Sequence, residues 1–173
     1  MGRKSFDISV FDILTVGKFS NSACFYFFFR QLWRKINIMD IQSLDKAVQQ
    51  IALKRNELKK IDYNNPKYDD LEEALHDLED AFLDDFGDEM EKVLQQVHDK
   101  ICPDTDVLLP IAYMAKSYII NEKNEFLVAP NEGVFVELEK LPSKETRLVI
   151  IPNPIRIVLN LGKDKQQVVW TGK

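Results

Sequence analysis

The residues best suited to metal chemistry are the acidic side chains around His76. Glu73 and His76 stand three positions apart, a spacing that places both side chains on one helix face, as in one half of a carboxylate-bridged di-iron site. The second half would need another Glu-x-x-His pair, and the other histidine, His98, has no glutamate three residues before it. A hydrated acidic face is therefore the better interpretation of this pattern, and the sequence predicts no metal and no cofactor. The candidate metal ligands in this pattern are Glu73, His76 and Asp80, with Glu72 beside them.

Other catalytic signatures are missing from the sequence. The acidic stretch from Asp84 to Glu89 lacks the ligand spacing of a calcium loop. Cys102 follows a predicted helix, where the helix dipole raises rather than lowers a thiol pKa. There is no phosphate-binding glycine loop, no nucleophile elbow and no recognisable Ser/His/Asp set. The pattern names no catalytic residue and favours a non-enzymatic function over an enzyme.

The most informative segment is an acidic run that also has a regular apolar pattern. Between Asp69 and Glu91 there are twelve acidic side chains and no Lys or Arg. Apolar residues recur there every third or fourth position, which predicts a helix with one buried face and one hydrated, negative face. They are Leu71, Leu75, Leu78, Phe82, Phe86 and Met90. The carboxylates that we expect to bind a partner are Asp69, Asp70, Glu72, Glu73, Asp77, Asp80, Asp84 and Asp85.

This acidic helix is expected to be the second arm of an antiparallel helical hairpin that spans residues 39–103. The first helix begins at an Asp40 N-cap and ends near Asp62, and Arg55 occupies one position of its core stripe. The second begins at Asn65-Pro66, ends at Cys102-Pro103 and has a possible kink at Gly87. The short connection and the heptad-like rhythm are typical of a small coiled coil. The stripe of the first helix is Ile41, Leu44, Val48, Ile51, Leu58 and Ile61.

After Asp106 the apolar period changes from helical to alternating, and residues 104–173 are expected to form a β module. Short strands joined by turn-like segments predict an antiparallel meander, either a sheet or a partly closed barrel. The fold class is therefore α+β, with the module packed on the Val93–Ile101 end of the second helix. Leu108–Met114 also fits a helical turn. The predicted strands are Ala112–Ile120, Glu125–Ala129, Val134–Glu139, Arg147–Ile151, Ile155–Leu161 and Gln166–Thr171.

Residues 1–38 do not share these patterns. They contain seven of the eleven phenylalanines but no helical or alternating period through their first half. One interpretation is that the segment is non-native and that translation starts at Met39. The other is an interfacial membrane anchor, in which aromatic side chains enter a bilayer and cations meet anionic headgroups. The anchor residues would be Phe25 to Phe29 and Trp33, with Arg30, Arg34 and Lys35.

Charge is distributed unevenly along the 173 residues, whose net charge is −5. Residues 1–38 carry six basic and two acidic side chains, residues 39–106 eight and nineteen, and residues 107–173 nine and seven. An acidic middle segment argues against general nucleic-acid binding. The two cysteines, Cys24 and Cys102, are too few for a disulfide framework and fit a cytoplasmic protein.

These features favour a protein–protein interaction module in which the acidic helix binds a basic partner protein or a second copy of the chain. A homodimer would cover apolar flanks at Leu53, Leu83 and Leu94. No membrane partner is expected if residues 1–38 are non-native. One alternative is a ligand-binding or enzymatic pocket between the sheet and the second helix, with Tyr113, Tyr118 and His98 at its mouth. Another is an acidic mimic of nucleic acid.

Overall fold

The computed structural model describes residues 39–138, 141, 144–163 and 165–173. The chain divides into two compact units, Met1–Ile38 and Met39–Lys173, and the described residues all belong to the second. The predictions for residues 1–38, a non-native extension or a membrane anchor, lie outside the described residues. Among the residues that are described, no helix combines the length and the apolar character needed to cross a bilayer.

The first described helix, α2, spans Ile41–Leu58 and begins as predicted. The Asp40 carboxylate accepts the backbone N–H of Gln42 at 3.0 Å and the Ser43 hydroxyl at 2.6 Å. It thereby satisfies a helix N-terminal donor that has no partner within the helix. The helix ends earlier than the predicted Asp62, because the backbone N–H groups of Lys60 and Ile61 bind carbonyls three residues before them and tighten the last turn.

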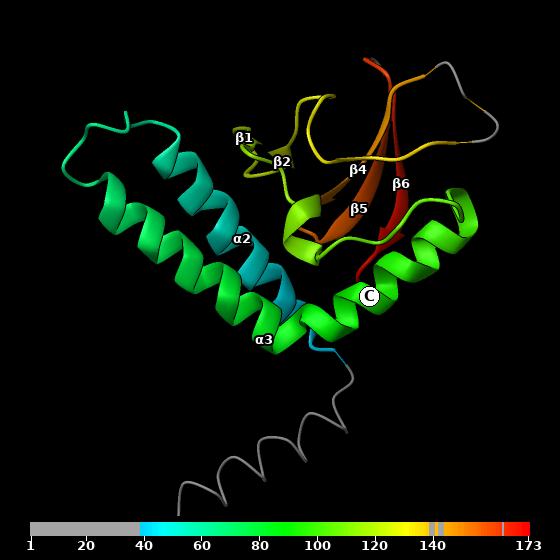
Figure 1. Ribbon diagram of the computed structural model, residues 1–173, viewed down its shortest axis with the longest axis horizontal. Helices are drawn as coiled ribbons and strands as arrows, with labels where there is room; N and C mark the ends of the chain where they lie inside the picture. The colour runs from blue at the N-terminus through cyan, green and yellow to red at the C-terminus, as the bar shows by residue number, and fades with distance from the viewer. Residues whose placement is uncertain (1–38, 139–140, 142–143, 164) are drawn as a thin grey trace, which may run out of the picture. The chain divides into compact units, whose positions relative to one another are not determined.

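The second helix, α3, spans Tyr68–Ile101 and is 34 residues long. It begins slightly later than predicted, because Asn65 uses its side-chain oxygen to accept the Lys67 backbone N–H at 3.0 Å in the preceding turn. It ends at Ile101 with Cys102 as its C-cap, in line with the predicted stop at Cys102-Pro103. The helix bends near its middle, the region that contains Gly87, and remains helical throughout (Figure 1).

The two helices form the predicted hairpin, with α2 packed along the first half of α3 (Figure 1). The predicted apolar stripes meet inside it: Leu44, Val48 and Ile51 of α2 are buried in the same cluster as Leu75 and Phe82 of α3. Burial of these stripes holds the carboxylates of α3 on its other side.

The first predicted strand, Ala112–Ile120, is mostly wrong. The chain forms a 3-10 helix, η1, at Pro110–Tyr113, in line with the helical turn considered for Leu108–Met114. Only β1, Ile119–Ile120, is a strand, and it pairs with β2, Phe126–Leu127.

The physical reason is that side chains of α2 bind the backbone between η1 and β1. The Met114 and Ala115 carbonyls accept from Arg55, and both backbone polar groups of Tyr118 bind the side-chain amide of Asn56 at 2.8 Å. Backbone groups that are satisfied by helix side chains are not available for a strand ladder.

The remaining strands form an open, four-stranded antiparallel meander in the order β3-β4-β5-β6. Their bounds are Val134–Phe135 for β3, Thr146–Ile151 for β4, Arg156–Leu161 for β5 and Lys165–Thr171 for β6. β3 and β6 are the two edges and do not pair with each other, so the sheet does not close into a barrel. β3 is shorter than the predicted Val134–Glu139, of which Glu139 lies outside the described residues.

Both faces of the central strands are covered. On one face Ile150 and Ile157 share a core cluster with Met90 and Leu94 of α3. On the other, Val158 packs with the segment around β1 and β2. The α+β fold is thus confirmed. The C-terminal half of α3 lies against the sheet (Figure 1).

Candidate functional site

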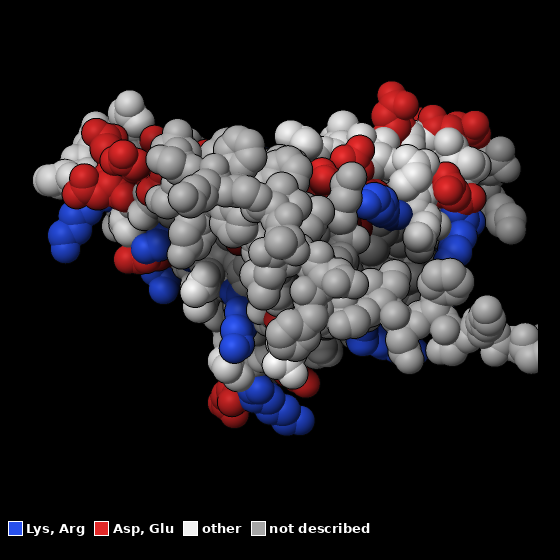
Figure 2. Space-filling view, turned by 90° about the horizontal axis from the view of Figure 1, so that it is seen from below, with Lys and Arg blue, Asp and Glu red and all other residues white. Residues whose placement is uncertain are grey.

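The predicted partner-binding carboxylates lie together on the outer side of the first half of α3. We call this set the acidic face. Asp85 and Glu73 are among the seven exposed members, whereas Glu72 is half-buried. Figure 2 shows Asp and Glu side chains at the end of the described unit where the hairpin turn lies, with Lys and Arg side chains beside them, and further Asp and Glu side chains at the opposite end. The exposed members are Asp69, Asp70, Glu73, Asp77, Asp80, Asp84 and Asp85.

Five of these carboxylates form a continuous row. They follow one another at steps of four, four, three and four residues, the spacing of neighbours on a helix surface. Like charges at such spacing destabilise a helix by about 0.2–0.5 kcal/mol per pair. The row therefore carries repulsion that the packing of α3 must overcome. Its members are Asp69, Glu73, Asp77, Asp80 and Asp84.

Glu79 belongs to the same acidic run but points inward. Its Oε1 accepts from Nε of Arg55 at 3.0 Å and from Nη2 at 2.6 Å, and both side chains are about 15% exposed. Within the part of the chain that the structure describes, this is the only salt bridge formed by residues 69–84. Glu79 is thus separate from the acidic face, because its carboxylate is directed at a cation of α2 inside the hairpin.

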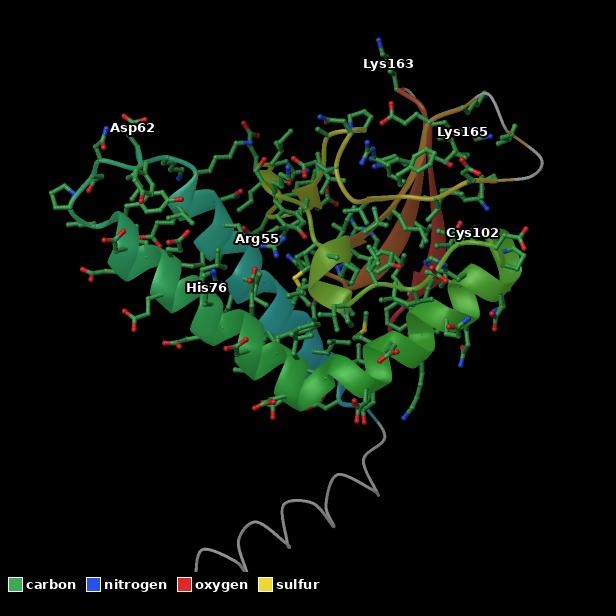
Figure 3. The ribbon with its side chains drawn as sticks, in the orientation of Figure 1. Arg55, Asp62, His76, Cys102, Lys163 and Lys165 are labelled. Carbon is green, nitrogen blue, oxygen red and sulfur yellow. The ribbon has the colours of Figure 1, made fainter. Side chains whose placement is uncertain are left out.

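Arg55 is the residue that joins the hairpin to the β module. It extends from α2 toward η1 (Figure 3), and beyond its bonds to Glu79 it donates to the Met114, Ala115 and Ile111 carbonyls at 2.9, 3.1 and 3.3 Å. All five N–H donors of the guanidinium group are therefore used. This explains why an arginine occupies an apolar stripe.

The candidate metal ligands do not form a site. Glu73, His76 and Asp80 are all exposed on α3. Among the described residues, no three His, Cys, Asp or Glu side chains are close enough together to hold a metal ion. The structure therefore offers Glu73, His76 and Asp80 only as part of a hydrated helix surface.

The three residues predicted at a pocket mouth are instead buried. His98 and Tyr113 are 0% exposed and Tyr118 is 5% exposed. His98 Nδ1 lies 2.9 Å from the Thr105 carbonyl, which can only accept, so Nδ1 carries the proton and Nε2 accepts the Tyr113 hydroxyl at 2.9 Å. His98 and Tyr113 thereby hold together the connection between α3 and η1.

Burial also makes the remaining ionisable groups of this region unreactive. Tyr118 donates to the Ile150 carbonyl and accepts the Ala115 backbone N–H. Removal of its hydroxyl from water raises its pKa well above the ordinary value. Burial likewise raises the pKa of the Cys102 thiol, against a smaller opposing effect of its hydrogen bond with Thr105. A thiol with a raised pKa is a poor nucleophile near neutral pH.

A groove does lie between the hairpin and the β module, but other residues line it. It is open and has a volume of about 880 Å³. Its apolar lining includes Leu58, Ile61, Tyr68, Leu75, Ile111 and Met114, and its charged lining is Arg55, Lys59, Glu79, Lys116, Glu132 and Arg147. Sequence reasoning missed this site because its residues come from five separate segments. The one available signal was that Ile61 continues the apolar stripe of α2 past the end of the helix at Leu58.

Comparison of the chain with protein-family models, with curated proteins and with solved structures finds no match.

Proposed function

We propose that the protein is a non-enzymatic interaction module whose acidic face binds a basic surface on a partner protein. The observation that carries the proposal is the exposed row from Asp69 to Asp84, which is held on a packed helix. A rigid surface of one charge steers and selects an oppositely charged partner. Binding would also relieve the repulsion within the row.

Charge favours a different protein over a second copy as the partner at this face. Two copies that met symmetrically through their acidic faces would bring like charges together, which costs free energy. Of the apolar flanks considered for a homodimer, Leu53 is 50% exposed, Leu83 is partly buried and Leu94 is 0% exposed. A single exposed leucine is ordinary for a protein surface.

The test compares two variants with equal net charge. In the first, Asp69, Glu73, Asp77 and Asp80 are changed to Asn or Gln. In the control, the same change is made at four exposed acidic residues outside α3. These are Asp104, Asp106, Glu122 and Glu137. Affinity for a short synthetic Lys/Ala peptide is measured by isothermal titration calorimetry at low and at physiological salt.

The face variant is expected to lose most of its affinity, whereas the control variant keeps most of the wild-type value. Equal losses in the two variants would mean that the peptide responds to net charge alone, and the acidic face would then not be a binding surface. Light scattering on the same samples is expected to show no dimer that depends on the acidic row. If a dimer formed and dissociated only in the face variant, the partner at the acidic face would be a second copy of the chain and not a different protein.

A further inference from the structure

We propose that the groove between the hairpin and the β module binds a small amphiphilic molecule with an apolar body and a single anionic group, such as a carboxylate, sulfonate or phosphate. This site is separate from the acidic face, and the inference does not rest on the function proposed for that face.

The apolar part of the groove remains partly open to water in the folded chain. Leu58, Ile61, Tyr68 and Ile111 are half-buried, and each lines the groove. Leu75 also lines the groove and is 8% exposed. An apolar body in the groove would remove these side chains from water, which is the main driving force for binding in such clefts.

The hydrogen bonds of Arg55 fix the position of this apolar lining. The guanidinium group holds α2, α3 and the 111–115 backbone together through Glu79 and three carbonyls. Because all of its donors are used, Arg55 serves as a wall of the groove and leaves the ligand charge to other cations. A preformed groove loses little conformational entropy when a ligand binds.

Two lysines supply the charge that selects an anion. Within the described part of the chain, Lys59 and Lys116 form no ion pair, although Lys59 donates to the Ser117 hydroxyl at 2.7 Å. The guanidinium of Arg147 is already paired with Glu145 at 2.8 Å. The lining carries four cations and two carboxylates, so it is net positive in a chain whose net charge is −5.

Glu132 is the carboxylate that opposes this selection. Its Oε2 accepts the Lys116 backbone N–H at 2.7 Å, which commits one of its oxygens to the protein itself. The ammonium groups of Lys59 and Lys116 carry two positive charges, and Glu132 carries one negative charge. The resulting positive potential attracts one anionic group. The size of the groove, about 880 Å³, is within the usual range of small-molecule sites.

The experiment uses two fluorescent probes that share one aromatic body. The first, 1-anilinonaphthalene-8-sulfonate, carries a sulfonate, and the second, N-phenyl-1-naphthylamine, is neutral. Both are titrated into the full chain and into three variants whose circular dichroism matches the wild type. Lys59→Gln with Lys116→Gln removes the proposed cations, Lys123→Gln with Lys163→Gln is the matched control, and Ala112→Trp fills the groove from an exposed position of its lining.

The sulfonate probe is expected to bind more tightly than the neutral probe. In the Lys59/Lys116 variant, the affinity for the sulfonate probe is expected to fall about tenfold, whereas the affinity for the neutral probe should stay unchanged. The Lys123/Lys163 control should bind both probes with wild-type affinity, and Ala112→Trp should bind both more weakly. Equal affinities of the two probes for the wild type, equal effects of the two lysine pairs, or retained binding in Ala112→Trp would each overturn the proposal. Variants of the acidic face should leave both probes unaffected, so this test is independent of the function proposed above.

Discussion

Arg55 of α2 and Glu79 of α3 are joined by two hydrogen bonds to a single carboxylate oxygen, from Nε at 3.0 Å and from Nη2 at 2.6 Å. Through this pair the acidic run of α3 contributes one charge to the contact between the helices, while the row from Asp69 to Asp84 remains exposed. The same guanidinium group binds three carbonyls around η1. The pair therefore connects the helices, the groove and the segment that leads into β1.

Removal of the carboxylate charge at Glu79 should destabilise the protein. Glu79→Gln leaves the nearly buried Arg55 guanidinium without its counter-charge, and we expect the free energy of unfolding to fall by about 2 kcal/mol, measured by urea denaturation. Glu73→Gln on the exposed side of α3 is the control and should change stability by no more than about 0.5 kcal/mol. Equal effects of the two changes would mean that the Arg55–Glu79 pair does not hold the fold.

Removal of the buried Tyr113 hydroxyl should destabilise the protein. In Tyr113→Phe, Nε2 of His98 loses its donor and the Leu108 backbone N–H loses its acceptor. Loss of these partners should cost about 1–3 kcal/mol of unfolding free energy. Tyr63→Phe, at a side chain that is 77% exposed, is the matched control. A stable Tyr113→Phe protein would contradict the network described for His98.

Stability should decrease at alkaline pH. Burial raises the pKa of both Tyr118 and Tyr113 in the folded chain. A group whose folded pKa is raised gives its full stabilisation below its unfolded pKa, which is about 10 for tyrosine, and loses it as the pH rises toward the folded value. Urea denaturation between about pH 9 and pH 11 should show this loss. Tyr118→Phe should have a lower free energy of unfolding at neutral pH, but this free energy should fall less than that of the wild type as the pH rises. An equally steep fall in the variant would contradict a raised pKa for Tyr118.

Two glycines should respond to alanine in opposite ways. Gly133 has φ of +95° and an added Cβ would lie 2.2 Å from the Leu148 carbonyl oxygen, so Gly133→Ala should be strongly destabilising. At Gly87 an added Cβ would make ordinary contacts with Leu83 at 3.7 Å or more. Because alanine is the better helix former, Gly87→Ala should stabilise the protein by about 1 kcal/mol in thermal or urea denaturation. A loss of stability at Gly87 would show that the bend in α3 requires glycine.

The helices were predictable from the sequence because their signals are local. Asp40 as N-cap, the stop at Cys102-Pro103 and the apolar stripes each follow from residues a few positions apart. The strands β4, β5 and β6 were predicted to within one residue at each end for the same reason. The exposure of the acidic face followed from the same periodicity, because the stripe determines which side of α3 is buried.

The features that were missed depend on contacts between residues far apart in the chain. The segment Ala112–Ile120 has the apolar alternation of a strand, but Arg55 and Asn56 bind its backbone across some sixty positions. The inward direction of Glu79 depends on the same arginine. An arginine in an apolar stripe does indicate a buried partner, but the pattern does not show which carboxylate it is.

The central claim, that the acidic face is a binding surface, is tested most directly by residue-resolved NMR. The isotope-labelled protein is titrated with the Lys/Ala peptide, and backbone amide shifts are followed. We expect the changes to concentrate between Asp69 and Asp84 on α3 and to disappear in the variant with Asn or Gln at Asp69, Glu73, Asp77 and Asp80. Changes spread evenly over all acidic regions of the chain, or centred on the β module, would contradict the account.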